Sequence, residues 1–181
     1  PEAGLALVSS ITGLADRQAF AEALAARWAA TSPHAALDAC KTFAAGELRA
    51  STFAAAIGTW AEKSPAEAAT WSATHLAGSA RQMAVTRAAE AWARLDPRAA
   101  AEWATSQSAS PAGMAAIEPV MAYWASTDPE SGAKWASGLP PGGFRQSAVN
   151  AIITEWADQF PAEAAAWSAL QRAKMIKRAS R

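Results

Sequence analysis

The sequence predicts an all-α protein, an elongated α-solenoid of about five and a half helix-turn-helix repeats. Tryptophan recurs every 32 residues, proline recurs at the same interval, and the apolar residues between them have helical spacing. The first tryptophan column contains Trp28, Trp60, Trp92, Trp124 and Trp156, and the proline column contains Pro1, Pro33, Pro65, Pro97, Pro129 and Pro161. A second tryptophan column contains Trp71, Trp103, Trp135 and Trp167, with Leu7 and Ala39 in the first two units.

The repeat accounts for the whole chain, residues 1–181, as a single domain without linkers. Its units are residues 1–32, 33–64, 65–96, 97–128 and 129–160, followed by a partial unit over residues 161–181. A helical hairpin in such an array covers its apolar face only by stacking on the next hairpin. Because alanine dominates the cores, the tryptophans supply most of the apolar area, and we expect their rings to be buried between successive hairpins.

The first helix of each unit is predicted to begin at the recurring proline, whose missing N–H would have no partner at the first helical position. Good N-cap residues precede this proline in four units: Ser32, Ser64, Asp96 and Asp128. Ser64 and Glu67 predict a capping box, whereas Phe160 leaves the last unit without a side-chain cap. The first helix is expected to end near Gly46, Gly78 and Gly142, where glycine suits a left-handed C-cap.

The second helix of each unit is predicted to run for about four turns, as far as the recurring Trp-Ala pair. In the third unit, Val85, Ala88 and Trp92 form one apolar stripe at helical spacing. Pro119 lies in the middle of the fourth unit's second helix and predicts a kink or a late start there. The segment before it allows this helix to begin at Pro111.

The repeat resembles the tetratricopeptide-like superfamily, because Pro65 precedes Trp71 by six residues, as at that family's junction between repeats. The period differs from that family's 34 residues, and Thr74 and His75 stand where its motif requires leucine and glycine. The pattern W-A-x3-P-x2-[AG]-[AL]-x-W also looks like repeats of large helical proteins of Verrucomicrobia-like and Planctomycetes-like bacteria. These resemblances imply a right-handed, tetratricopeptide-like scaffold that binds proteins or peptides.

Composition argues against several other classes of function. The 16 basic and 16 acidic side chains cancel, which disfavours binding to nucleic acid or to an anionic membrane. The chain has no apolar run of about 18 residues and no basic stretch before an apolar one at its start, so we expect a soluble protein without a membrane span. An upstream signal or anchor remains open, and so does the choice between bacterial cytoplasm and periplasm.

Residues for catalysis are sparse. Cys40 is the only cysteine, which excludes an internal disulfide or a cysteine-based zinc site, and we interpret it as a small apolar residue. His34 is interpreted as a solvated first-turn residue, and His75 as a packing or capping residue one turn after Trp71. No nucleophile, base and acid occur in a recognisable set. The sequence therefore predicts a protein that is not an enzyme and that needs no cofactor or metal.

A row of cations stands at equivalent places in the first turn of the predicted second helices, where the helix dipole disfavours positive charge. Two interpretations remain open. In the first, structural interpretation, each cation lies across a tryptophan ring or donates hydrogen bonds to the free carbonyls at the end of the first helix. In the second, functional interpretation, the cations line a face that holds a carboxylate-bearing peptide. Gly113 interrupts the row and favours the first interpretation. The row consists of Arg17, Arg49, Arg81, Arg145 and Lys177.

The leading functional hypothesis is a scaffold whose concave face binds a protein segment through the first helices. The equivalent positions on that face hold chemically different residues in successive units, namely Asp38, Thr70, Glu102 and Lys134. Such variation is expected of a surface that recognises one partner, and also of a surface that is merely solvated. The alternative is a structural spacer or self-assembling module that stacks end to end through its C-terminal end. We interpret the tryptophans as core residues rather than as a ladder for sugars or bases.

The last ten residues carry five cations and no acid: Arg172, Lys174, Lys177, Arg178 and Arg181. Three interpretations remain open for this segment, namely a frayed or truncated terminus, a docking surface for another copy or a downstream domain, and a polyanion-binding tail.

Overall fold

The computed structural model describes the backbone of residues 2–179 and the side chains of residues 4 and 6–171. Throughout this part of the chain the secondary structure is helical, and no helix of the described residues is long and apolar enough to cross a membrane. The helices are α1 (Glu2–Ser10), α2 (Leu14–Ala29), α3 (Pro33–Cys40), α4 (Glu47–Ala61), α5 (Pro65–His75), α6 (Gly78–Leu95), α7 (Pro97–Ser106), α8 (Pro111–Thr127), α9 (Pro129–Ser137), α10 (Gly143–Gln159) and α11 (Pro161–Ala179).

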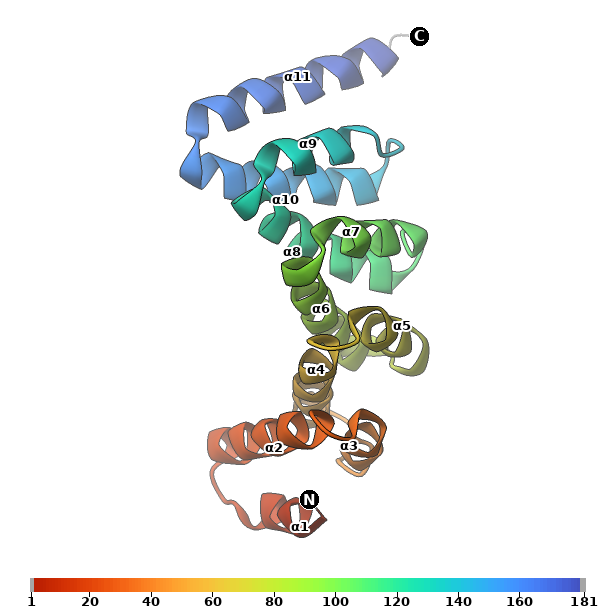
Figure 1. Ribbon diagram of the computed structural model, residues 1–181, viewed down its shortest axis with the longest axis vertical. Helices are drawn as coiled ribbons and strands as arrows, with labels where there is room; N and C mark the ends of the chain where they lie inside the picture. Colours follow the sequence, from red (N-terminus) through yellow and green to blue (C-terminus); the bar gives the residue numbers. More distant parts are fainter. Residues whose placement is uncertain (1, 180–181) are drawn as a thin grey trace.

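The helices follow one another along the longest axis of the molecule, with α1 and α11 at opposite ends (Figure 1). Extensive contacts join helices that are neighbours or next neighbours in the chain. The second helices of successive units form the main row, in which α2 packs on α4, α4 on α6, α6 on α8, and α8 on α10. Each of the first helices α3, α5, α7 and α9 packs between two members of this row.

The two tryptophan columns meet where one unit ends and the next begins. Trp92 and Trp103 have their ring centroids 6.0 Å apart, and Trp124 and Trp135 have theirs 5.9 Å apart. The pairs Trp60–Trp71 and Trp156–Trp167 have the same arrangement, at 6.4 and 6.0 Å. Trp60, Trp124 and Trp156 are buried, whereas Trp28, Trp92 and the second column are half-buried. The predicted contact between rings of successive hairpins is confirmed for these four pairs, whereas the predicted burial holds for only three of the eight rings.

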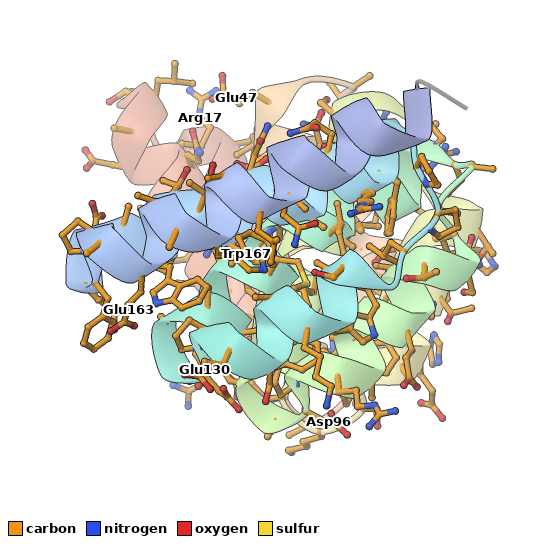
Figure 2. The ribbon with its side chains drawn as sticks, turned by 90° about the horizontal axis from the view of Figure 1, so that it is seen from above. Arg17, Glu47, Asp96, Glu130, Glu163 and Trp167 are labelled. Atoms are coloured by element: carbon orange, nitrogen blue, oxygen red, sulfur yellow. The ribbon has the colours of Figure 1, made fainter. Side chains whose placement is uncertain are left out.

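Small side chains allow the first helices to approach the row closely. Ala68, Ala69 and Ser72 of α5 are fully buried around Trp71. The hydroxyl of Ser72 donates to the carbonyl of Ala68, 2.7 Å away, so this buried polar group is satisfied within its own helix. At the C-terminal end, Trp167 belongs to α11, and its side chain projects from that helix when the molecule is viewed along its long axis (Figure 2).

Two of the four predicted N-caps make side-chain hydrogen bonds. Asp96 Oδ1 accepts from Ala99 N at 2.9 Å, and Asp128 Oδ1 accepts from Ser131 N at 3.1 Å. Hydrogen bonds from Ser131 lower the pKa of Asp128 below its usual value. Ser64 makes no such bond, so the predicted capping box is wrong. With similar backbone angles, the longer aspartate side chain reaches the amide that the serine hydroxyl does not.

The recurring glycines serve the second helices rather than the first. Gly46 and Gly142 immediately precede α4 and α10 with φ of 148° and 153°, and Gly78 is the first residue of α6 with φ of 56°. The prediction that they close the first helices is therefore wrong. The first helices end before these glycines. The positive φ, which only glycine adopts easily, occurs at the start of the second helix, where the chain changes direction.

Helices α8 and α11 also differ from expectation. Helix α8 begins at Pro111, as predicted, and continues through Pro119, so a late start is wrong. Pro119 has no N–H for the carbonyl of Ala115, and the hydroxyl of Thr86 on α6 donates to that carbonyl at 3.4 Å. Helix α11 runs without a break to Ala179, so Lys177 lies near its end rather than in the first turn of another helix. The side chain of Lys177 and those of the other C-terminal cations lie outside the described residues.

Candidate binding groove

A groove of about 510 Å³ crosses three members of the row of second helices, α2, α4 and α6. Because α4 packs on both α2 and α6, we call the α4 part of the groove its floor and the α2 and α6 parts its walls. The lining residues are Gln18, Glu22 and Ala26 of α2, Ser51, Ala54, Ala55, Gly58, Thr59 and Glu62 in and next to α4, and Met83, Arg87, Glu90, Ala91 and Arg94 of α6.

Small side chains of α4 create the hollow. Between Ser51 and Thr59, every lining residue of α4 is alanine, glycine or a small hydroxylic residue. The corresponding positions of the next unit hold Met83, Arg87 and Glu90, whose longer side chains border the groove. The sequence signal for the groove was therefore a run of small residues on one second helix beside long residues on the next. This signal was missed because small and long residues are equally compatible with an α-helix.

The walls carry charges of both signs. On α2, Gln18 Nε2 donates to Glu22 Oε1 at 2.9 Å, and on α6, Arg87 forms an ion pair with Glu90 at 3.2 Å. Glu62 and Arg94 are exposed lining residues that follow the small-residue floor toward the C-terminal ends of α4 and α6. The groove therefore combines a small-residue floor with charged walls, an arrangement suited to a polar or amphipathic ligand.

The four positions predicted to line a concave face lie outside this groove. Asp38, Thr70, Glu102 and Lys134 are exposed on α3, α5, α7 and α9, and none of them lines the groove. A hydrogen bond and the positive charge of Lys41, 2.7 Å away, lower the pKa of Asp38. Glu102 pairs with Arg98 at 2.9 Å. The groove lies on the row of second helices, and whether these four residues line a concave face and bind a partner stays a prediction.

Three members of the cation row hold the turn between the two helices of their own unit. Arg17 Nε donates to the carbonyl of Ile11 at 2.9 Å, and Arg81 Nε donates to that of Leu76 at 2.6 Å. Arg145 Nη1 lies 3.5 Å from the carbonyl of Leu139. In each case the guanidinium binds a carbonyl that follows the first helix, which offsets the unfavourable position of the cation in the helix dipole. Arg49 is half-buried.

The gap at Gly113 has a steric reason. A Cβ atom at this position would overlap the carbonyl group of Gln107 and lie 2.8 Å from the carbonyl oxygen of Ala104. The Gln107 carbonyl accepts instead from the backbone N and the hydroxyl of Ser110, at 2.8 and 2.9 Å. Ser110 thus satisfies the turn carbonyl that an arginine binds in three other units.

Arg145 also joins three helices. This arginine of α10 is buried, and its Nη2 donates to Oε1 of Gln171 on α11 at 2.8 Å. Gln171 Nε2 in turn donates to the hydroxyl of Ser137 on α9 at 2.9 Å. The buried charge therefore has hydrogen-bond partners on both sides, which is the condition for tolerating it in a protein interior.

Replacing Arg81 by alanine is expected to lower the free energy of unfolding by about 1–2 kcal/mol, because the Leu76 carbonyl loses a charged donor in a half-buried turn. Urea unfolding followed by circular dichroism measures the change. Arg98→Ala is the matched control, since Arg98 makes an exposed ion pair, and it should cost less than about 0.5 kcal/mol. Equal losses in the two variants would contradict a turn-holding role for Arg81.

The two histidines and the cysteine lie apart from the groove. His34 meets Trp60 edge-on at 4.9 Å between ring centroids, and His75 stacks on Trp71 at 4.9 Å with the rings 10° apart. His34 is thus in contact with a ring although it is exposed, and His75 packs as predicted. Cys40 is buried, and burial raises the pKa of its thiol to about 12.

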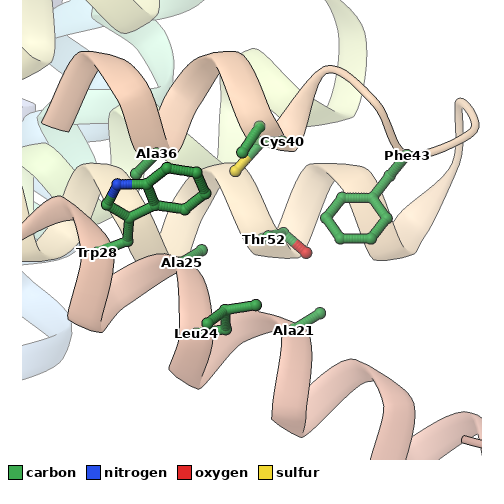
Figure 3. A pocket seen from close by; sticks show the side chains of 9 residues that line it. Ala21, Leu24, Ala25, Trp28, Ala36, Cys40, Phe43 and Thr52 are labelled. Atoms are coloured by element: carbon green, nitrogen blue, oxygen red, sulfur yellow. The ribbon is translucent and has the colours of Figure 1, made fainter. Parts of the chain in front are cut away.

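A small cavity of about 10 Å³ lies beside Cys40, between α2, α3 and α4. Ala39 stands here in place of the second-column tryptophan, next to Trp28, so the cavity lies where the tryptophan pairing of the later units is missing. The thiol of Cys40 points toward the space bordered by Trp28 and Thr52 (Figure 3). The space is comparable to one water molecule and its lining is mostly apolar, so it does not offer room for an organic ligand.

The Cys40 thiol is expected to be protected from a disulfide reagent such as DTNB at pH 8. A pKa of about 12 reduces the thiolate fraction by about 1,000-fold relative to an unfolded chain, and Cys40 is only 1% exposed to the reagent. Reaction should proceed at the ordinary rate once urea unfolds the chain. Rapid modification of the folded protein would contradict the described burial.

No protein-family model, curated protein or solved structure that was compared with the chain matches it.

Proposed function

We propose that the chain is a non-enzymatic helical-repeat scaffold, an α-solenoid of tetratricopeptide-like hairpins that binds a segment of a partner protein or a peptide. The repeat period, the neighbour-to-neighbour helix contacts and the paired tryptophans support this architecture. In such an array the hairpins form a rigid frame, and a long surface is left free for a partner.

The groove over α2, α4 and α6 is the observation that carries the binding proposal. Its volume of about 510 Å³ falls within the range of about 300–1,000 Å³ typical of ligand sites. Its small-residue floor allows a peptide backbone to approach α4, and its charged walls supply hydrogen-bonding groups for orientation. These features support a peptide segment as the ligand more than they support a flat protein surface, which would not enter the hollow.

A displayed library of random peptides of about ten residues tests this proposal. Peptides selected on the wild-type chain should lose about tenfold or more of their affinity for Ala55→Trp, which fills the floor of the groove. Ala66→Trp is the matched control, because Ala66 is exposed on α5 outside the groove. Both variants must melt at the wild-type temperature for the comparison to count.

Selection that enriches no peptide, or peptides that bind Ala55→Trp as tightly as the wild type, would contradict a peptide-binding groove. Light scattering at several concentrations then distinguishes the alternative. A chain that binds no peptide and grows in mass with concentration would favour a self-assembling module.

A further inference from the structure

We propose that the groove selects segments carrying one lysine or arginine, whose stem lies over α4 and whose charge is held on the acidic side of the groove, by Glu22 of α2 or by Glu62 at the end of α4. This inference rests on the proposed peptide-binding function and names the class of ligand. It is carried by the uneven distribution of charge across the groove.

The two sides of the groove differ in charge. Both lining cations, Arg87 and Arg94, belong to α6, and Arg87 is already paired with Glu90. The lining residues of α2 and the α4 segment include two carboxylates and no cation. One side of the groove is therefore acidic, and the other is neutral to basic.

The nearby cations of α2 and α4 do not pair with these two carboxylates. Arg17 binds the carbonyl of Ile11, and Lys63 Nζ donates to the carbonyl of Ala30 at 2.9 Å. Arg27 and Arg49 are not among the lining residues. Among the described side chains, neither Glu22 nor Glu62 takes part in an ion pair.

Glu22 retains capacity for a ligand. Its side chain is half-buried, and its Oε1 accepts a hydrogen bond from the neutral side-chain amide of Gln18. A carboxylate has about four acceptor sites, so most of them stay free for a charged donor. An ion pair in a half-buried position is screened less by salt than one on an open surface.

The floor suits the stem of a long basic side chain. Ala26, Ala54 and Ala55 present methyl groups on the acidic side of the groove. Lysine and arginine bury their aliphatic stems along such apolar surface while the charged head reaches polar groups. A short acidic side chain would gain no comparable contact and would meet the carboxylates.

The opposite wall limits the sequence around the basic residue. Successive side chains of an extended peptide point to opposite sides. A residue adjacent to the lysine or arginine would therefore face α6, where Arg94 disfavours a second cation and Arg87 is already paired with Glu90. The groove is thus expected to favour a single basic residue with neutral or acidic neighbours over a run of basic residues.

Sequencing the library selected on the folded wild-type chain tests this inference. We expect lysine and arginine to be enriched at one position and basic pairs to be depleted. A selected peptide and its variant with glutamine in place of the basic residue should differ about threefold to tenfold in dissociation constant. The E22Q/E62Q double variant should remove this difference, and E130Q/E163Q, at exposed positions outside the groove, should preserve it (Figure 2).

The outcomes separate the inference from the proposed function. Enrichment of acidic or purely apolar peptides that still lose binding to Ala55→Trp would overturn the inference and leave the peptide groove standing. Basic enrichment that survives in E22Q/E62Q would also overturn it, because the charge would then be held elsewhere. Peptides that bind the wild type and Ala55→Trp alike would overturn both proposals.

Discussion

Replacing Trp124 by alanine is expected to lower the free energy of unfolding by about 3–5 kcal/mol. Trp124 is 7% exposed at the end of α8, and its ring lies 5.9 Å from that of Trp135 on the next first helix. Met121 and Gly132 lie close by, since a Cβ atom on Gly132 would be 3.5 Å from the Trp124 ring. The substitution would therefore leave a cavity between tightly packed helices and remove an aromatic pair.

Urea unfolding followed by circular dichroism measures this loss, with Leu95→Ala as the control. Leu95 is a large apolar residue that is 61% exposed, so its truncation should cost less than about 0.5 kcal/mol. Because each unit contacts mainly its neighbours, weakening one junction should also broaden the transition or split it in two. A loss below about 0.5 kcal/mol for Trp124→Ala would contradict the role of these rings as the contact between hairpins.

The sequence was sufficient to predict the helical hairpins because the repeat multiplies each weak local signal. One proline before a helix or one tryptophan at its end says little, but recurrence at a fixed interval aligns the units with one another. The starts of α3, α5, α7, α9 and α11 at the recurring proline follow from this alignment. So does the pairing of Trp92 with Trp103, which depends on two columns being brought together at the same junction.

The position of the groove could not be predicted in the same way. The periodicity identifies two rows of helices but does not say which row leaves a hollow surface. Small residues occur on both rows, as Ala68 and Ala69 in one and Ala54 and Ala55 in the other. Ala68 and Ala69 are fully buried under neighbouring helices, whereas Ala54, which is 4% exposed, and the half-buried Ala55 line the groove, a difference that depends on how the helices pack.

The turns were the least predictable part, because equivalent sequence positions are used in different ways. A glycine between two helices can close the first or open the second, and the φ of Gly46 assigns it to the second. The cation row was open to two interpretations because an arginine at the start of a helix can extend into solvent or donate hydrogen bonds to the preceding turn. The bonds of Arg17 and Arg81 to turn carbonyls could be recognised only with the turn in view.

Gly113 provides the sharpest contrast between the repeat pattern and the structure. Arginine stands at this position in four units, so a comparison of units alone would recommend Gly113→Arg as a stabilising change. The structure predicts the opposite. The new Cβ would overlap the Gln107 carbonyl, and backbone atoms cannot rotate aside as a flexible side chain can.

Gly113→Ala is therefore expected to cost about 1–3 kcal/mol of unfolding free energy, and Gly113→Arg at least as much. Gly58→Ala is the matched control, because a Cβ there would lie an ordinary 3.8 Å from the nearest atom, on Arg87. It should stabilise α4 by about 0.5–1 kcal/mol, since alanine is the better helix former. Thermal and urea unfolding of the three variants and the wild type would rank their unfolding free energies. A Gly113→Arg variant more stable than the wild type would mean that the α7–α8 turn is more open than described, and that a guanidinium can replace Ser110 at the Gln107 carbonyl.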